Sequence, residues 1–193
     1  MRPVMFDVDG VLADFVLGFL EVVSKLPGGE HIIPYSTPKQ KAWDFNLRPE
    51  LLRAGWDQVR QMRHFWADLP ALVSDDAFRC LARMSRYRDV YFVTNRVGHQ
   101  AHNQTREWLI AHRIYNPTVV VCGRKGQFAN AVNAAAMIDD KAGNAVYVAY
   151  ESPDTSSFLI DRPYNRFDSA VLGSKVTRVE RVEQFIEAVA QIP

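Results

Sequence analysis

Two aspartates, Asp7 and Asp9, follow a short apolar stretch near the start of the chain, and Gly10 comes directly after them. Residues two apart in an extended segment project to the same side, so both carboxylates are expected at one end of a strand, where Gly10 allows a sharp turn. Such close carboxylates repel each other unless a cation joins them, and a cluster of oxygens suits Mg²⁺. A solvated turn is the alternative, because Asp and Gly are common turn residues.

A second acidic pair, Asp139 and Asp140, ends another apolar run. Taken alone, this pair fits a capping turn as well as a ligand site. Together with Asp7 and Asp9, it places four carboxylates at the ends of two strands that we expect to be neighbours. That concentration of negative charge predicts a divalent metal site.

Groups suited to phosphate follow two further apolar runs. Thr94, Asn95 and Arg96 supply a hydroxyl, an amide and a guanidinium, and Lys125 follows the next run. A lysine can neutralise phosphate as a point charge. Singly, Thr94 fits a helix cap and Lys125 a solvated loop. The order of acid pair, hydroxyl, lysine and acid pair, all at strand ends, is much more specific and predicts chemistry at a phosphate group.

The elements that must position these residues alternate between short apolar runs and helical periodicity. We predict strands at 4–8, 90–94, 118–122, 136–138, 145–148 and 158–160, and helices at 76–87, 100–112 and 180–190. Continuous apolar runs are typical of parallel strands buried on both faces. The alternation predicts an α/β fold with a doubly wound, Rossmann-like parallel sheet, in which ligands bind outside the carboxyl ends of the strands.

One region interrupts the alternation, since no convincing strand occurs between residues 15 and 74. A helix is expected over 14–26, and Pro49 suits the first turn of another. We therefore predict a core formed by residues 1–14 and 75–193, and a small helical cap, residues 15–74, inserted after the first strand.

Bulk properties narrow the class of protein. The 193 residues carry 23 basic and 22 acidic side chains, a net charge of +1, so no overall field favours nucleic-acid polymers or membranes. No apolar run approaches the roughly 20 residues of a membrane-spanning helix, and the N-terminus lacks the apolar region of a signal peptide. We expect a cytoplasmic protein whose partner is a small anionic molecule.

With this order of acids, hydroxyl and lysine, the sequence resembles the haloacid dehalogenase superfamily. The four parts of its signature match residues 7–10, Thr94, Lys125 and residues 139–140, in the expected order. More narrowly, residues 7–15 resemble the 5'(3')-deoxyribonucleotidases, which share the extension Gly-Val-Leu-Ala-Asp-Phe. Further support comes from residues 47–51, 138–141 and 162–165, whereas the remainder of the cap matches only loosely.

The resemblance implies a covalent phosphohydrolase. Asp7 would attack phosphorus and form an aspartyl-phosphate, and Asp9 would protonate the leaving alkoxide and then activate water. Dehalogenases of the superfamily have no alkoxide to protonate and lack an acid at the position of Asp9, which therefore favours phosphoryl transfer.

The same resemblance implies how phosphate and metal are bound. Thr94 and Lys125, helped by the backbone around Asn95, would bind the non-bridging oxygens. Mg²⁺ would be held by the Asp7 carboxylate, the main-chain carbonyl of Asp9 and Asp139, and Asp140 would orient the ligands.

Substrate choice is expected to come from the cap. Phe15 corresponds to an aromatic residue that stacks on the nucleobase in the deoxyribonucleotidases, and Trp43, Phe45, Phe65 and Trp66 are candidates to complete such a platform. Stacking contributes about 1–3 kcal/mol per base. The alternative for each ring is a place in the core of the cap itself.

Two departures from the family pattern concern selectivity. Asn95 and Arg96 stand where the deoxyribonucleotidases have Ser and Pro, and residues 72–74 replace a common Pro-Gly-Ala. These changes leave selectivity for deoxyribose open. Arg96 is expected either to bind a second anionic group or to pair with an acid such as Asp89.

The sequence thus predicts a magnesium-dependent 5'-nucleotidase that hydrolyses nucleoside monophosphates through an aspartyl-phosphate intermediate. A phosphatase of the same mechanism acting on a sugar phosphate, phosphotransfer to an acceptor other than water, and a catalytically silent binding module are the alternatives. The intact Asp7, Asp9, Lys125 and Asp139 argue against the silent module. Base preference and oligomeric state stay open.

Overall fold

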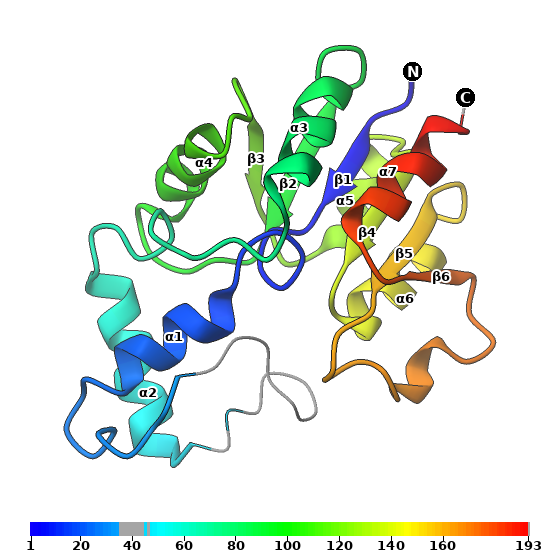
Figure 1. Cartoon of the computed structure of the whole chain (residues 1–193). Coiled ribbons are helices and arrows are strands. Elements are labelled where there is room, and N and C mark those ends of the chain that lie inside the picture. The colour runs from blue at the N-terminus through cyan, green and yellow to red at the C-terminus, as the bar shows by residue number, and fades with distance from the viewer. Residues whose placement is uncertain (35–44, 46, 193) are drawn as a thin grey trace.

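The computed structural model describes residues 1–34, 45 and 47–192. Within these ranges the chain forms one parallel sheet (Figure 1) of β1 (Val4–Phe6), β2 (Val90–Thr94), β3 (Thr118–Val121), β4 (Ala136–Asp139), β5 (Ser156–Ile160) and β6 (Val176–Val179). The strand order is β3-β2-β1-β4-β5-β6, and every neighbouring pair is parallel. The predicted doubly wound sheet is confirmed. The order reverses at β1, where such folds bind ligands.

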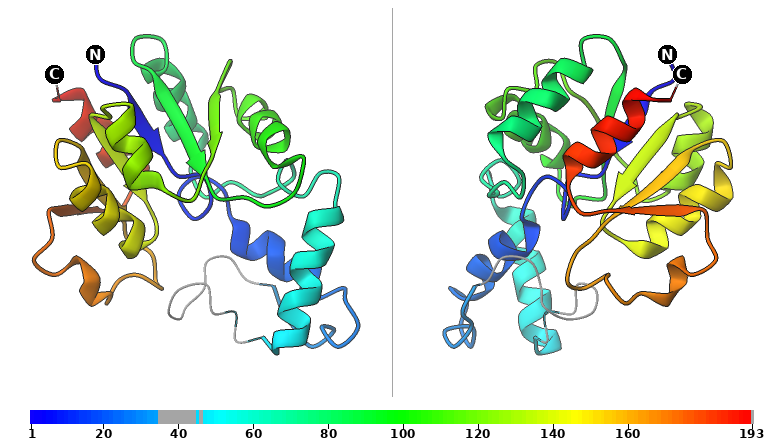
Figure 2. Two further views of the ribbon diagram at one scale, coloured as in Figure 1. Left: turned by 180° about the vertical axis from the view of Figure 1, so that it is seen from behind. Right: turned by 45° about the vertical axis from the view of Figure 1, so that its right-hand side comes forward.

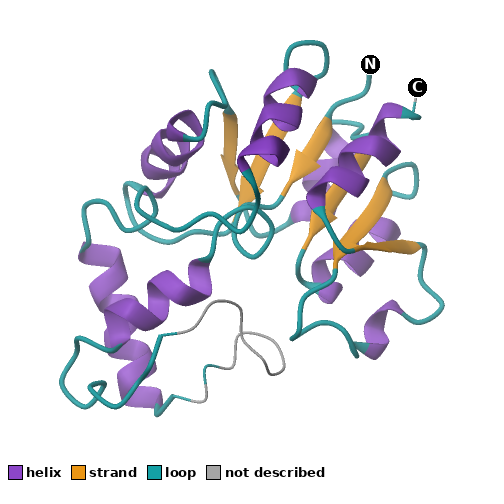
Figure 3. Ribbon diagram, in the orientation of Figure 1, coloured by secondary structure: helices purple, strands orange, loops and turns teal. Residues whose placement is uncertain are grey.

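Helices cover both faces of the sheet, as Figures 2 and 3 show. On one face lie α3 (Asp75–Met84), α4 (Ala101–Ala111) and α7 (Val182–Ala190), and on the other lie α5 (Lys125–Ala131) and α6 (Ala142–Glu151), while a short 3₁₀ turn, η1 (Ser169–Val171), precedes β6. Contacts between rings, such as Phe78 of α3 against Trp108 of α4 at 5.7 Å between centroids, join helices of the same layer.

The central strand divides its side chains between the two layers. Val4 and Phe6 belong to the large core beneath α3, α4 and α7, whereas Met5 packs with Met137 on the side of α5 and α6. This alternation is the period of two that a strand imposes. The ring of Phe6 meets that of Phe185 edge to face at 4.9 Å, which ties α7 to β1. Burial on both faces explains why β1 reads as a continuous apolar run.

Two features of the sheet differ from the sequence prediction. Residues 145–148 are not a strand but part of α6, where Ala142, Ala145 and Val148 are buried and Tyr147 is exposed. Burial at every third residue is helical, and a short apolar run alone does not distinguish the two structures. The prediction missed β6, whose middle residues, Thr177 and Arg178, are exposed because the strand lies at the sheet edge.

Between β1 and β2 the described residues form two helices beyond the carboxyl edge of the sheet, α1 (Phe15–Val23) and α2 (Pro49–Gln61). Asp14 caps α1, since its carboxylate accepts from the backbone N–H of Leu17 at 3.0 Å. Pro49 opens α2 as predicted. Treating residues 15–74 as a cap separate from the core remains a prediction. Within the described ranges, no helix has the length and apolar character needed to cross a bilayer.

The outgoing and returning segments of this excursion lie side by side. The backbone N–H of Asp14 donates to the carbonyl of Pro70 at 2.7 Å, and the backbone N–H of Leu72 donates to the carbonyl of Leu12 at 2.7 Å. The indole of Trp108 on α4 donates to the carbonyl of Leu69 at 2.7 Å. These bonds fix the α1–α2 pair relative to the sheet.

Gly55 allows α1 and α2 to pack closely, which gives a stability test. A Cβ at this position would lie 2.7 Å from Val23 and 2.9 Å from Phe19, both fully buried. Overpacking costs about 1–3 kcal/mol, and the helix propensity of alanine returns about 1 kcal/mol. We expect Gly55→Ala to lower the free energy of unfolding in urea titrations.

The control for this variant is Gly143→Ala on α6, where an added Cβ meets nothing within 4 Å. It should stabilise the protein by about 0.5–1 kcal/mol through helix propensity alone. Equal effects of the two substitutions would contradict the close approach of α1 and α2.

Candidate active site

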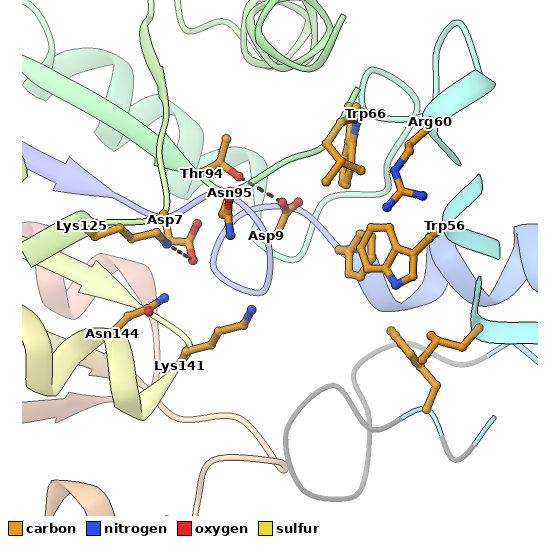
Figure 4. A pocket seen from close by; sticks show the side chains of 15 residues that line it. Asp7, Asp9, Trp56, Arg60, Trp66, Thr94, Asn95, Lys125, Lys141 and Asn144 are labelled. Carbon is orange, nitrogen blue, oxygen red and sulfur yellow. Dashed lines mark hydrogen bonds and ion pairs between the residues drawn. The ribbon is translucent and has the colours of Figure 1, made fainter. Parts of the chain in front are cut away.

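A pocket of about 430 Å³ opens at the carboxyl edge of β1 and β2 and extends to the α1–α2 pair (Figure 4). One end is polar and the other largely aromatic. The polar part is lined by Asp7, Asp9, Thr94, Asn95, Gly123, Lys125, Lys141 and Asn144, and the remainder by Phe15, Phe45, Leu52, Trp56, Arg60, Trp66 and Val97. Strands far apart in the sequence meet here because parallel strands end at a common edge.

The acid cluster, Asp7, Asp139 and Asp140, lies behind the polar end of the pocket, and of the three only Asp7 lines it. Phe6 pairs with Ile138 in the sheet, so the next residues along each strand, Asp7 and Asp139, are brought together. Each of the three acids offers a carboxylate oxygen, and these oxygens all lie within 4.8 Å of one another; Asp139 and Asp140 are fully buried, and Asp7 is nearly so. In the part of the chain described, Oδ1 of Asp140 is a buried oxygen that receives no hydrogen bond.

Lys125 is the ammonium group inside this cluster. Its Nζ lies 2.6 Å from Asp7 Oδ2 and 2.7 Å from Asp139 Oδ2. Asp139 also accepts from the backbone N–H of Lys141 at 2.8 Å and from Asn144 at 3.1 Å. Three buried carboxylates against one ammonium leave negative charge uncompensated. Together with the oxygen that lacks a donor, this excess fits an oxygen-binding divalent cation such as Mg²⁺.

Burial governs the ionisation of the cluster. It raises the pKa of Asp7 well above the usual range, and Asp139 and Asp140 add to that rise although Lys125 opposes it. Burial, with the charge of Asp139, also raises the pKa of Asp140 to about 6. Burial alone would lower the pKa of Lys125, but Asp139 and Asp7 outweigh it and raise that pKa. Lys125 therefore stays charged, and full ionisation of the acids is disfavoured unless another cation is present.

Asp9 lies apart from the acid cluster. Its carboxylate accepts from Thr94 Oγ1 at 3.1 Å and from Arg96 Nη2 at 2.8 Å. Arg96 thus pairs with an acid, as one of the two sequence alternatives had it, but that acid is Asp9 rather than Asp89. Among the described residues, the pocket wall does not include Arg96.

The loop after β5 supports the acids from behind. The hydroxyl of Tyr164 donates to Asp140, and Asn165 Nδ2 donates to the carbonyl of Asp140 at 2.7 Å. The guanidinium of Arg162 donates to the carbonyl of Gly10 at 2.7 Å. Gly10 has φ +77°, and a Cβ there would collide with Asp140 and Tyr164. The sequence motif at 162–165 marked this loop, but its contacts with the acids were not predicted.

The aromatic end is built around Phe15. Its ring stacks on those of Trp56 and Trp66, at centroid distances of 5.4 and 5.6 Å. The predicted Phe45 and Trp66 line the pocket with it. The sequence predicts a pocket position for Phe65 also, but that ring packs edge-on against Trp66 at 4.7 Å, outside the wall.

The remaining residues of the aromatic end are one that the sequence predicted and two that it missed. Trp43 lies outside the described residues. Trp56 and Arg60 of α2 line the pocket but were not singled out from the sequence. They lie four residues apart, as do Leu52 and Trp56, and that spacing on one helix face was the available signal.

Solved structures share this fold, among them two hydrolases. One is described as a haloacid dehalogenase-like hydrolase from Burkholderia xenovorans LB400, with TM-score 0.61, 14% identity and coverage of 99% of this chain and 98% of that one. The other is a HAD family hydrolase from Deinococcus radiodurans R1 with bound phosphate and sodium, with TM-score 0.60, 12% identity and coverage of 99% and 96%. No curated protein matches the sequence.

The fold is the one that these two hydrolases have, and the acids, the hydroxyl and the lysine follow one another in the order that the sequence predicted. The family model described as "5' nucleotidase, deoxy (Pyrimidine), cytosolic type C protein" matches residues 2–191, so the chain belongs to this 5'-nucleotidase family. The protein is therefore a phosphoric monoester hydrolase.

The raised pKa of Asp140 predicts an unusual dependence of stability on pH. A carboxyl group whose pKa is about 6 in the fold, against 3.8 ordinarily, binds more protons folded than unfolded between these values. Its stabilising effect is thus complete below pH 3.8 and is lost as pH rises through 6. In EDTA, we expect the Tm to fall between pH 5 and 7.

Mg²⁺ should reverse this trend, because a bound cation favours the ionised acids, and its effect on Tm should be larger at pH 7.5 than at pH 5. Asp140→Asn should flatten the slope in EDTA. A Tm in EDTA that rises from pH 5 to 7, or a Mg²⁺ effect that is larger at pH 5, would contradict the electrostatics of the cluster.

Proposed function

We propose that the protein is a magnesium-dependent 5'-nucleotidase that hydrolyses nucleoside monophosphates, deoxynucleotides among them, through an aspartyl-phosphate on Asp7. The observation that carries this proposal is the composition of one pocket: acids, a lysine and a threonine at one end, and stacked aromatic rings at the other. A phosphate and a planar base joined by a sugar have the same division of polarity. Membership of the 5'-nucleotidase family supports the same substrate class.

In the first step, an oxygen of Asp7 attacks phosphorus and the ester P–O bond breaks. The backbone N–H of Val8 holds Oδ1 of Asp7 at 2.7 Å, and Lys125 holds Oδ2, so the nucleophile is fixed in orientation. Asp9 gives its proton to the leaving alkoxide. In the second step Asp9 takes a proton from water, which attacks the aspartyl-phosphate and releases phosphate, leaving Asp7 free.

Phosphate oxygens would be bound by Thr94, the segment at Asn95 and Lys125. Asp7 and Asp139, with the main-chain carbonyl of Asp9, would hold Mg²⁺, and Asp140 would orient the site through its contact with Tyr164. The cation would supply positive charge that lets an anionic nucleophile approach an anionic phosphate.

The α1–α2 pair would determine the substrate. We propose that residues 15–74 act as a cap whose rings Phe15, Phe45, Trp56 and Trp66 receive the base. A sugar phosphate is the rival substrate, and it lacks a planar base that would stack on the aromatic wall. We place this activity in the cytoplasm, as expected from the sequence.

Replacement of the nucleophile tests the reaction. With Mg²⁺ present, Asp7→Asn should lower phosphate release from nucleoside monophosphates by at least about 1,000-fold, because an amide cannot replace the carboxylate that forms the covalent intermediate. Asp76→Asn, which changes an exposed acid paired with Arg79, is the control and should retain activity. Activity that persists in Asp7→Asn would exclude the covalent route.

Removal of a ring tests the substrate class. Trp56→Ala should raise KM for nucleoside monophosphates roughly 10-fold, the equivalent of one stacking contact, and should leave KM for glycerol phosphate nearly unchanged. Both substrates should be measured with the wild-type protein as well. An equal preference for sugar phosphates and nucleotides in the wild type would refute the nucleotidase assignment within this enzyme class.

A further inference from the structure

Arg96 forms a buried ion pair that is separate from the acid cluster. Its side chain is 0% exposed, and that of Asp9 is 14% exposed. Nη2 lies 2.8 Å from Asp9 Oδ1, and Nε lies 3.0 Å from Asp9 Oδ2, so the guanidinium meets both carboxylate oxygens. A planar fork of this kind fixes the direction of a carboxylate, which a single point charge does not.

The guanidinium is itself held from its other side. Nη1 donates to Thr105 Oγ1 on α4 at 2.9 Å and reaches the carbonyl of Trp66 at 3.5 Å. The guanidinium carbon also lies 4.8 Å from the centroid of the Trp66 ring. Trp66 is held in turn by two hydrogen bonds. Its indole N–H donates to the carbonyl of Val97 at 2.9 Å, and its backbone N–H donates to the side-chain oxygen of Gln104 at 2.8 Å. Arg96 therefore has little freedom to move.

This arrangement divides the acids between two cations. Lys125 forms ion pairs with Asp7 and Asp139, whereas Arg96 forms an ion pair with Asp9. The other donor to the Asp9 carboxylate is the hydroxyl of Thr94, a group that the proposed reaction directs to phosphate. Once Thr94 turns to the substrate, Arg96 is the group in this set that still orients Asp9.

We propose that Arg96 is a positioning residue that holds the Asp9 carboxylate in line with the leaving oxygen of the substrate. This inference rests on the proposed function of Asp9 as general acid and base. Arg96 is not among the residues that line the pocket, so in this proposal it acts through Asp9.

Leaving-group dependence tests the inference. A nucleoside leaving as an alkoxide needs a proton, whereas p-nitrophenolate leaves without one. Since a positioned acid contributes about 100-fold or more, Arg96→Met should lower kcat for a nucleoside monophosphate by roughly 100-fold, and kcat for p-nitrophenyl phosphate by less than about 5-fold when dephosphorylation is not limiting. The rate of the phosphorylation step, measured in single turnovers, separates the two half-reactions.

A double-mutant cycle with Asp9→Asn gives the second readout. If Arg96 acts through Asp9, adding Arg96→Met to Asp9→Asn should lower the rate by no more than about 3-fold further. Multiplicative losses would overturn the inference. Arg96→Lys keeps the charge but not the fork, so it should recover only part of the rate; full recovery would overturn the geometric role.

The matched control is Arg88→Met, which removes another buried arginine whose guanidinium donates to the carbonyls of Val189 and Ile192. It should lower Tm without changing the ratio of the two substrates. Should Arg96→Met fail to fold, Arg96→Lys carries the same comparison. A wild-type protein that hydrolyses neither substrate refutes the proposed function, whereas an active wild type with an unchanged substrate ratio in both Arg96 variants refutes only the inference.

Discussion

Three carboxylates buried beside a single lysine are the constraint on which the remainder of this molecule depends. Asp7, Asp139 and Asp140 would repel one another strongly in a medium of low polarity. Lys125 offsets part of that repulsion through contacts of 2.6 and 2.7 Å. The sheet, with β1 paired to β4, forces the first two acids together, and packing energy from the apolar strands and helices must offset the cost.

The surrounding structure serves to hold this unfavourable cluster in place. In the loop after β5, Tyr164 and Asn165 donate hydrogen bonds to Asp140, and Arg162 donates one to the carbonyl of Gly10. These contacts come from a segment that follows the last acid by some 20 residues in the chain. They show why the site needs the whole sheet: strand β5 must be in register beside β4 before its loop can reach the acids.

Under the proposed function, reaction and selectivity belong to different parts of the fold. The acids and the threonine lie at or just after strand ends, and the lysine is the first residue of α5, which follows β3. The aromatic rings come from α1, from α2, from Phe45 between these helices, and from the segment that returns to the sheet. Trp66 belongs to both parts, since it lines the pocket and also packs on Arg96, the partner of Asp9. The orientation of the proposed proton donor is thus linked to the segment that shapes the substrate site.

Much of this was predictable from the sequence alone. The continuous apolar runs predicted the doubly wound sheet, and the order Asp7, Thr94, Lys125, Asp139 predicted which side chains meet, because the carboxyl ends of parallel strands share one edge. Residues 145–148 were wrongly predicted as a strand, since a short apolar run fits either period, and β6 was missed because an edge strand is partly polar. Local pattern therefore determined the chemistry but not every element.

Only the tertiary structure decided the partners of Arg96 and the identity of the aromatic wall. Asp9 and Arg96 are 87 residues apart, and no periodicity or spacing links them. Trp56 and Phe65 are both aromatic residues of the region between β1 and β2, yet one lines the pocket and the other packs behind it. Such choices depend on how α1 and α2 pack against each other and against the sheet, and that packing depends on contacts between side chains distant in the sequence.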